Sequence, residues 1–329
     1  MKFAKFKIKG VKRMSGYMGY LLVYFTGESE TGEQVYFSIS RDGLHWQDLN
    51  EGRPVLKSTV GEMGVRDPFI IRSAEGDKYY IIATDLRIAG GKGWSWAVSQ
   101  ASRSVVVWES SDLVSWSGEE LIEVGIPEAG CVWAPEAIYD EKNKDYMMFW
   151  ASNVKEAGDK AAKHRIYYAR TKDFHTFTKA EKYIERENHI IDTTIVREEG
   201  YYYRISKDET TKNIRIDRGP DLTEGPFSAV AAPELEAVMG VEGPIAFRFN
   251  DKEQWCLMVD RFMTDGGYLP LVTDSLASGS FTALDPSGYD MGKTKKRHGS
   301  VLKLTKEEYD LLVSRYNGIP KIHIDTAGV

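Results

Sequence analysis

The stretch Val65-Arg-Asp-Pro-Phe-Ile-Ile71 is a short apolar strand that carries one carboxylate, Asp67, at its mouth. Four later stretches repeat this arrangement: Trp133-Ala-Pro-Glu-Ala-Ile-Tyr139, Ile191-Asp-Thr-Thr-Ile-Val196, Glu242-Gly-Pro-Ile-Ala-Phe247 and Arg297-His-Gly-Ser-Val-Leu302. Each of the five stretches carries one acidic or imidazole residue, and consecutive ones are 50 to 69 residues apart. These residues are Asp67, Glu136, Asp192, Glu242 and His298. A period of this size in a strand-rich sequence is typical of a closed array of blades. Because the first strand of each propeller blade lines the central channel, the pattern predicts five polar side chains around one funnel.

A second repeat supports five units. Each unit ends in a turn that an Asp or Ser opens by bonding its own backbone, followed by an aromatic residue. The aromatic residues are Trp46, Trp116, Phe177, Phe227 and Phe281. We expect them to pack between neighbouring blades.

The two ends of the chain predict how the ring closes. Strand patterns at 20–24 and 34–38 lack an inner strand, whereas 298–302 supplies an inner strand without outer partners. Joining them completes a blade and leaves no exposed edge. The predicted fold class is therefore all-β, a five-bladed β-propeller whose last blade is closed by strands from both termini. We expect residues 1–329 to form one domain of this fold, in which 1–13 are an edge extension and 303–329 a helix and tail.

The composition excludes some classes of binding partner and indicates the compartment of the protein. The net charge of −6 argues against nucleic acid, which favours a basic surface. No apolar run approaches the roughly 20 residues of a membrane helix, and the basic N-terminus makes a poor signal peptide. We expect a cytoplasmic protein, or a secreted one if a signal was removed. Cys131 and Cys256 lie within apolar strand patterns and are expected to be buried, reduced thiols.

Three carboxylates in one funnel predict hydrolysis of a glycosidic bond without a cofactor. An ionised carboxylate activates water as general base, and a protonated one gives its proton to the leaving oxygen. A third charge nearby raises the pKa of the acid. A spacing of roughly 6.5–9.5 Å between acid and base leaves room for the water of an inverting reaction.

In order and spacing, the Asp-Pro, Trp-Ala-Pro, Ile-Asp-Thr and Glu-Gly-Pro motifs resemble glycoside hydrolase family 43 over residues 15–302. The resemblance implies a five-bladed propeller, inversion of configuration, and plant cell-wall arabinofuranosides or xylosides as substrates. By position, Asp67 matches the general base, Asp192 the modulating aspartate and Glu242 the general acid. One departure is that about 60 residues precede Asp67, so the closing blade is assembled differently.

The remaining motif residues have less certain roles. Glu136 and Trp133 belong to the Trp-Ala-Pro motif, outside the triad, and are predicted to contact the sugar; for Glu136 a structural role is an equal alternative. His298 resembles a histidine that helps hold a calcium ion or a water cluster in the central channel, and a satisfied core histidine is the alternative. A structural calcium is thus possible, although the chemistry requires none.

Further sugar contacts are expected from long loops. Trp94 and Trp96, in the loop 87–103, are predicted to form a sugar platform. Three arginines, Arg218, Arg261 and Arg297, could each reach the funnel, and the sequence does not say which of them does. Arg261 is the predicted substrate contact. The loops 87–103 and 153–164 are expected to block one end of the site, which favours exo action.

The predicted function is an exo-acting, inverting glycosidase that removes terminal α-L-arabinofuranosyl residues from arabinan or arabinoxylan. β-1,4-Xylosidase and β-D-galactofuranosidase are alternatives on the same scaffold, and endo-arabinanase is a further one. A sugar-binding propeller without catalysis, or a protein-interaction scaffold, belongs to a different class, because propellers host many functions.

Overall fold

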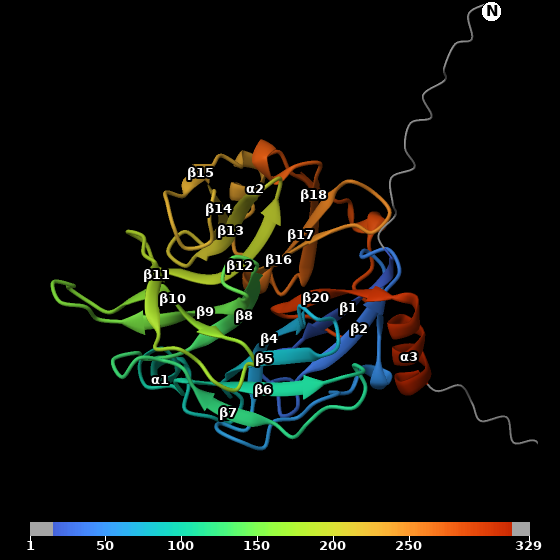
Figure 1. Ribbon diagram of the computed structural model, residues 1–329, viewed down its shortest axis with the longest axis horizontal. Coiled ribbons are helices and arrows are strands. Elements are labelled where there is room, and N and C mark those ends of the chain that lie inside the picture. The colour runs from blue at the N-terminus through green and yellow to red at the C-terminus, as the bar shows by residue number, and fades with distance from the viewer. Residues whose placement is uncertain (1–15, 318–329) are drawn as a thin grey trace, which may run out of the picture.

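The computed structural model describes residues 16–317, and they form five four-stranded antiparallel sheets arranged as a propeller (Figure 1). The inner strands, one per blade, are β4 (Val65–Arg72), β8 (Trp133–Asp140), β12 (Ile190–Glu198), β16 (Glu242–Arg248) and β20 (Gly299–Thr305). The predicted fold class is confirmed.

The outer strands follow each inner strand in simple meander order. In chain order they are β5 (Tyr79–Asp85), β6 (Ser104–Ser110) and β7 (Glu120–Glu123), then β9 (Asp145–Val154), β10 (Lys163–Thr171) and β11 (Glu181–Ile184), then β13 (Tyr201–Asp208), β14 (Asn213–Gly219) and β15 (Ser228–Val230), then β17 (Trp255–Asp260), β18 (Tyr268–Thr273) and β19 (Thr282–Ala283). Apolar residues pack in clusters that join neighbouring blades, so the core lies between sheets.

The last blade joins both ends of the described chain, as predicted. β20 pairs with β1 (Tyr17–Tyr24), which continues into β2 (Tyr36–Ser40) and β3 (Trp46–Asp48). An ion pair also fastens this blade, because Nζ of Lys296 lies 2.6 Å from Oδ1 of Asp48. The edge extension at 1–13 and the tail beyond residue 317 lie outside the described residues.

The turn-and-aromatic repeat has the predicted role in four units, where Trp46, Trp116, Phe177 and Phe281 join clusters between blades; Phe227 instead packs under Arg204 of its own blade. Oδ1 of Asp112, for example, accepts hydrogen bonds from the backbone N–H groups of Val114 and Ser115 at 2.9 and 2.7 Å. Trp116 then packs edge-on against Phe37 of the neighbouring blade, with ring centroids 6.1 Å apart. Cys131 and Cys256 are buried and free, as expected.

Helices are few and short. They are α1 (Trp94–Ser99), α2 (Pro233–Glu236) and α3 (Lys306–Tyr316), with 3-10 turns η1 (Asn50–Gly52), η2 (Phe262–Thr264), η3 (Leu276–Ser278) and η4 (Pro286–Gly288). Thr305 caps α3 through a capping box with Glu308. None of the helices in the described range is long and apolar enough to cross a membrane.

Four inner strands share a β-bulge near their funnel ends. One residue in each has a left-handed backbone: Asp67 (φ 50°), Ala134 (φ 48°), Asp192 (φ 46°) and Gly243 (φ 52°). The strand register shifts at each of these points. Such bulges re-aim side chains, and a left-handed non-glycine residue is costly enough to persist only where the surrounding structure enforces it.

Candidate active site

The bulges surround a cavity of about 450 Å³ at the funnel. The residue just before each left-handed position lines this cavity, and these residues are Arg66, Trp133, Ile191 and Glu242. Asp67 and Asp192, at the left-handed positions themselves, line it as well. The structure therefore brings the three predicted catalytic carboxylates, from three blades, into one cavity.

Asp67 is built to stay ionised. Its Oδ2 accepts a hydrogen bond from Oγ1 of Thr84 at 2.9 Å, and its Oδ1 lies 3.5 Å from Nδ1 of His298. Burial alone would raise the pKa of Asp67, but the nearby His298 and Arg66 outweigh burial and lower it. An ionised carboxylate is the form that a general base requires.

Asp192 is held by backbone instead. Its Oδ2 accepts a hydrogen bond from the Gly243 N–H at 3.1 Å and lies 3.8 Å from Nδ1 of His298. Gly243 leaves room for the His298 ring, because a Cβ atom at this position would lie 2.7 Å from that ring. Burial raises the pKa of Asp192 to about 6, with His298 acting in the opposite direction.

Glu242 differs from the sequence expectation in its protonation. Nζ of Lys207 lies 2.8 Å from its Oε2, and Nη2 of Arg297 lies 2.7 Å from its Oε1. Burial alone would raise the pKa of Glu242, but Lys207 and Arg297 lower it. In this structure the predicted acid is therefore ionised, because two cations that local sequence could not place are bound to it.

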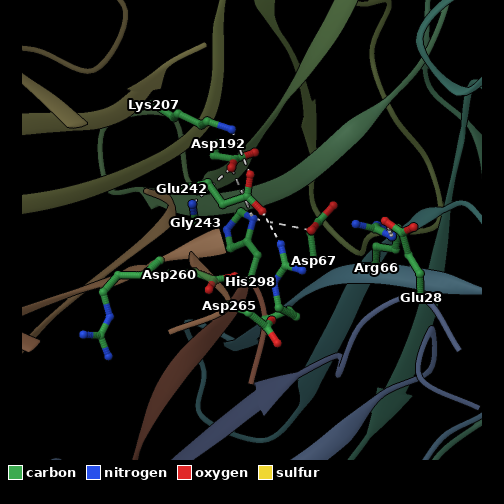
Figure 2. Close-up of polar contacts among 12 residues, drawn as sticks. Glu28, Arg66, Asp67, Asp192, Lys207, Glu242, Gly243, Asp260, Asp265 and His298 are labelled. Carbon is green, nitrogen blue, oxygen red and sulfur yellow. Dashed lines mark hydrogen bonds and ion pairs between the residues drawn. The ribbon is translucent and has the colours of Figure 1, made fainter. Parts of the chain in front are cut away.

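His298 lies between the carboxylates (Figure 2). Burial alone would lower its pKa, but the charges of Asp192 and Asp67 raise it to about 9. A protonated imidazole donates from both ring nitrogens, and it would have to lose one proton before it could ligate a metal. Across residues 16–317 no group of three or more His, Cys, Asp or Glu side chains is placed to hold a metal ion. Calcium near His298 stays a prediction, and we derive no step through it.

The structure corrects the position of Glu136. It lies on β8, three residues beyond Trp133, is 5% exposed and does not line the cavity. Burial raises its pKa to about 8. The bulge places Trp133 at the mouth of this strand and turns Glu136 into the channel interior, so the structural alternative for Glu136 is the one that the geometry supports.

Two other predicted sugar contacts lie away from the cavity. Trp94 lines it, whereas Trp96 does not and instead stacks under Nζ of Lys92 at 4.0 Å. The two rings separate because 94–99 is a helix, on which residues two apart point to different sides. Arg261 donates to the Gly267 carbonyl at 3.1 Å and holds its own loop. Of the three candidate arginines, Arg297 is the one in the cavity lining.

Trp133 is in the cavity, as predicted, and has a neighbour that the sequence did not reveal. His164, at the start of β10, stacks on Trp133 with ring centroids 5.2 Å apart and lines the same cavity. Burial lowers the pKa of His164 to about 4, so this ring is neutral. Lys207 and Arg66 also line the cavity, although the sequence patterns did not identify them. Lys207 is the register partner of Ile191, the residue next to Asp192.

Comparison with known proteins identifies the family. A family 43-related profile, described as a probable glycosyl hydrolase domain, matches residues 15–310. The chain belongs to this family. The chain is also 29% identical, over 323 residues, to an α-L-arabinofuranosidase of Bifidobacterium longum subsp. longum. The match covers 87% of this chain but only 29% of the length of that relative.

Solved structures agree on the fold. A family 43 β-1,3-galactosidase superposes with a TM-score of 0.58 at 14% identity, over 83% of this chain and 58% of the other. A mutant of the family 43 protein BlXynB from Bacillus licheniformis gives a TM-score of 0.53 at 16% identity, over 88% of this chain and 56% of the other. At such identities the likeness concerns the propeller fold, and it does not choose a sugar for this glycosyl hydrolase.

Proposed function

We propose that this glycosyl hydrolase removes terminal α-L-arabinofuranosyl residues from arabinan or arabinoxylan with inversion of configuration. The observation that carries the proposal is the meeting of Asp67, Asp192 and Glu242 in one cavity. The similarity to an α-L-arabinofuranosidase favours the arabinofuranosyl group over other sugars.

In the proposed reaction, a water molecule attacks the anomeric carbon and Asp67 accepts one of its protons. Glu242, when protonated, gives its proton to the glycosidic oxygen as the bond to the anomeric carbon breaks. Asp192 orients the site through the Gly243 N–H and adds negative charge that favours a proton on Glu242. The cycle closes when Asp67 releases its proton and Glu242 regains one.

The shape of the cavity supports exo action. Trp94 of α1 and His164 of β10 stand on the walls, and they come from the two segments expected to block one end of the site. A cavity of about 450 Å³ is within the usual range for small-ligand pockets. It suits one terminal sugar better than an extended chain.

The test is a panel of 4-nitrophenyl glycosides: α-L-arabinofuranoside, β-D-xyloside and β-D-galactofuranoside. Wild type, Glu242→Gln and a matched control, Glu234→Gln, are assayed together. Glu234 is exposed on α2, outside the cavity lining. We expect wild type and Glu234→Gln to turn over the arabinofuranoside. Glu242→Gln should keep part of this activity, because 4-nitrophenolate leaves with little protonation, but should lose turnover of the matching natural oligosaccharide. Turnover of another sugar alone would refute the proposed specificity, and full activity of Glu242→Gln on the oligosaccharide would refute the assigned acid.

A further inference from the structure

Each oxygen of the Glu242 carboxylate is bound by a cation. Nζ of Lys207 lies 2.8 Å from Oε2, and Nη2 of Arg297 donates to Oε1 at 2.7 Å. A carboxylate held in this way carries a negative charge. The structure therefore shows Glu242 in the form that remains after it has given its proton away, and the cavity must have a way to return to the loaded form.

The two cations differ in what else they bind. Nε of Arg297 donates to Oδ2 of Asp260 at 2.6 Å, and Asp260 is 1% exposed on β17. Arg297 is thus locked between two carboxylates by a planar group with fixed donor directions. It cannot release Glu242 without also disturbing a buried ion pair.

Lys207 has a different second partner. Its Nζ lies 2.6 Å from Oε2 of Glu209, whose side chain is 26% exposed in the turn that follows β13. Glu209 also pairs with Lys212. The Lys207 ammonium contacts both carboxylates at once, so a small movement of this compact charge can strengthen one contact at the expense of the other. The Phe262 ring lies 4.2 Å from Nζ and keeps the ammonium within the cavity.

We infer that Lys207 is a positioning residue that alternates between Glu242 and Glu209 during turnover. This inference rests on the proposed role of Glu242 as proton donor. When Glu242 carries its proton, Lys207 is bound by Glu209. As the proton passes to the glycosidic oxygen, negative charge forms on Glu242, and the returning ammonium stabilises that charge. A cation already inside the cavity needs little reorganisation for this task.

Charges other than Lys207 also surround Glu242 and affect how readily it binds a proton. The titratable groups that face it are Lys207, Arg297, Asp192, Asp67, Asp260 and, against Gly243, His298. The aspartates favour a proton on Glu242 and the two cations oppose it. Removing either partner of the Lys207–Glu209 pair leaves the other groups in place, so the two changes can be compared directly.

The experiment measures kcat/KM against pH for Lys207→Met and Glu209→Gln. The substrate is a short oligosaccharide of whichever sugar wild type cleaves, because a poor leaving group makes protonation limiting. Lys207→Met removes a cation that holds the charge on Glu242, so the alkaline limb should move up by about 1–3 pH units. Glu209→Gln removes the alternative partner and leaves Lys207 on Glu242, so the limb should move down and kcat should fall more than KM changes.

The decisive result is a pair of opposite shifts together with a fall in kcat for Glu209→Gln. A merely structural role would lower kcat and Tm without moving the limb, whereas fixed charges would move the limbs and leave kcat unchanged, which would overturn the exchange. The matched control is Lys142→Met, which changes a half-exposed lysine in the turn between β8 and β9 that pairs with Asp221 and does not line the cavity. Unchanged limbs in both variants, or shifts in the same direction, would overturn the inference. If Lys207→Met fails to fold, Glu209→Gln decides alone, and an unmoved limb refutes the exchange. Loss of activity in Glu242→Gln shows separately that the acid assignment stands.

Discussion

The two sides of the cavity are built on the same kind of strand bulge, but one presents charged side chains and the other presents neutral rings. On the charged side, Asp67, Asp192 and Glu242 are held by His298, Lys207 and Arg297. On the neutral side, Trp133 stacks on His164, which burial keeps uncharged, and Trp94 meets Trp133 edge-on at 6.1 Å.

The strand bulge makes the two sides comparable. Trp133 before Ala134 occupies the position that Glu242 before Gly243 occupies two blades later. The same strand bulge thus presents an aromatic ring in one blade and a carboxylate in another. The chemistry of each side is decided by a single residue at an equivalent position, and we expect the charged side to govern kcat and the neutral side to govern KM.

The largest effect is expected on the charged side, from Asp67→Asn. An amide cannot take a proton from water, so kcat should fall by about 10³-fold or more. The side chain keeps its volume and can still accept from Thr84, so the fold should be retained. Steady-state kinetics on the preferred aryl glycoside, with near-UV circular dichroism as a folding check, measure both. Activity within tenfold of wild type would remove Asp67 as the base.

Glu242→Ala tests the charged side further when two substrates with different leaving groups are compared. Without the proton donor, a natural oligosaccharide should lose about 10²–10⁴-fold in kcat, whereas an activated aryl glycoside needs less protonation and should lose much less. Competing assays on the two substrates give the ratio. Equal losses on both would mean that Glu242 acts on the charged side in another way, such as sugar binding.

The two sides should also respond to pH in opposite directions. Burial raises the pKa of Asp192 to about 6, so the folded protein holds this proton more tightly than the unfolded chain does. Stability supported by this proton is present in acid and lost as pH rises through about 6. At pH 7 the buried charge opposes folding, and Asp192→Asn should raise the free energy of unfolding by about 1–3 kcal/mol, with a smaller gain at pH 4.

On the neutral side the sign reverses. Burial lowers the pKa of His164 to about 4, so the unfolded chain binds this proton more readily. Stability is lost as pH falls from about 6.5 towards 4. His164→Phe should therefore gain stability relative to wild type only in acid, whereas Asp192→Asn gains it above pH 6. Parallel urea titrations across this range measure both, and matching pH trends would contradict the contrast between the two sides.

The sequence was informative where function follows from local spacing. The five blades, their closure by both ends and the convergence of Asp67, Asp192 and Glu242 follow from strand patterns and their period. Glu136 lies three residues from Trp133 on the same strand, and the bulge between them decides which of the two side chains lines the cavity. The sequence pattern does not show this bulge. Lys207 stands in the second strand of its blade, and its approach to Glu242, 35 residues later, depends on how two blades pack.

The smallest expected effect concerns the ring that joins the two sides. Trp94 lines the cavity and lies 5.0 Å from the Arg66 guanidinium, whereas Trp96, two residues on, faces Lys92. A sugar-stacking contact contributes about 0.5–1.5 kcal/mol, if it resembles other aromatic contacts, so Trp94→Ala should raise KM by about 2–10-fold with little change in kcat. Trp96→Ala is the matched control, with the same residue type on the same helix. Equal KM values for both variants would place the sugar away from α1, whereas a fall in kcat for Trp94→Ala would show that Trp94 also positions Arg66 beside Asp67 and that the neutral side takes part in the chemistry.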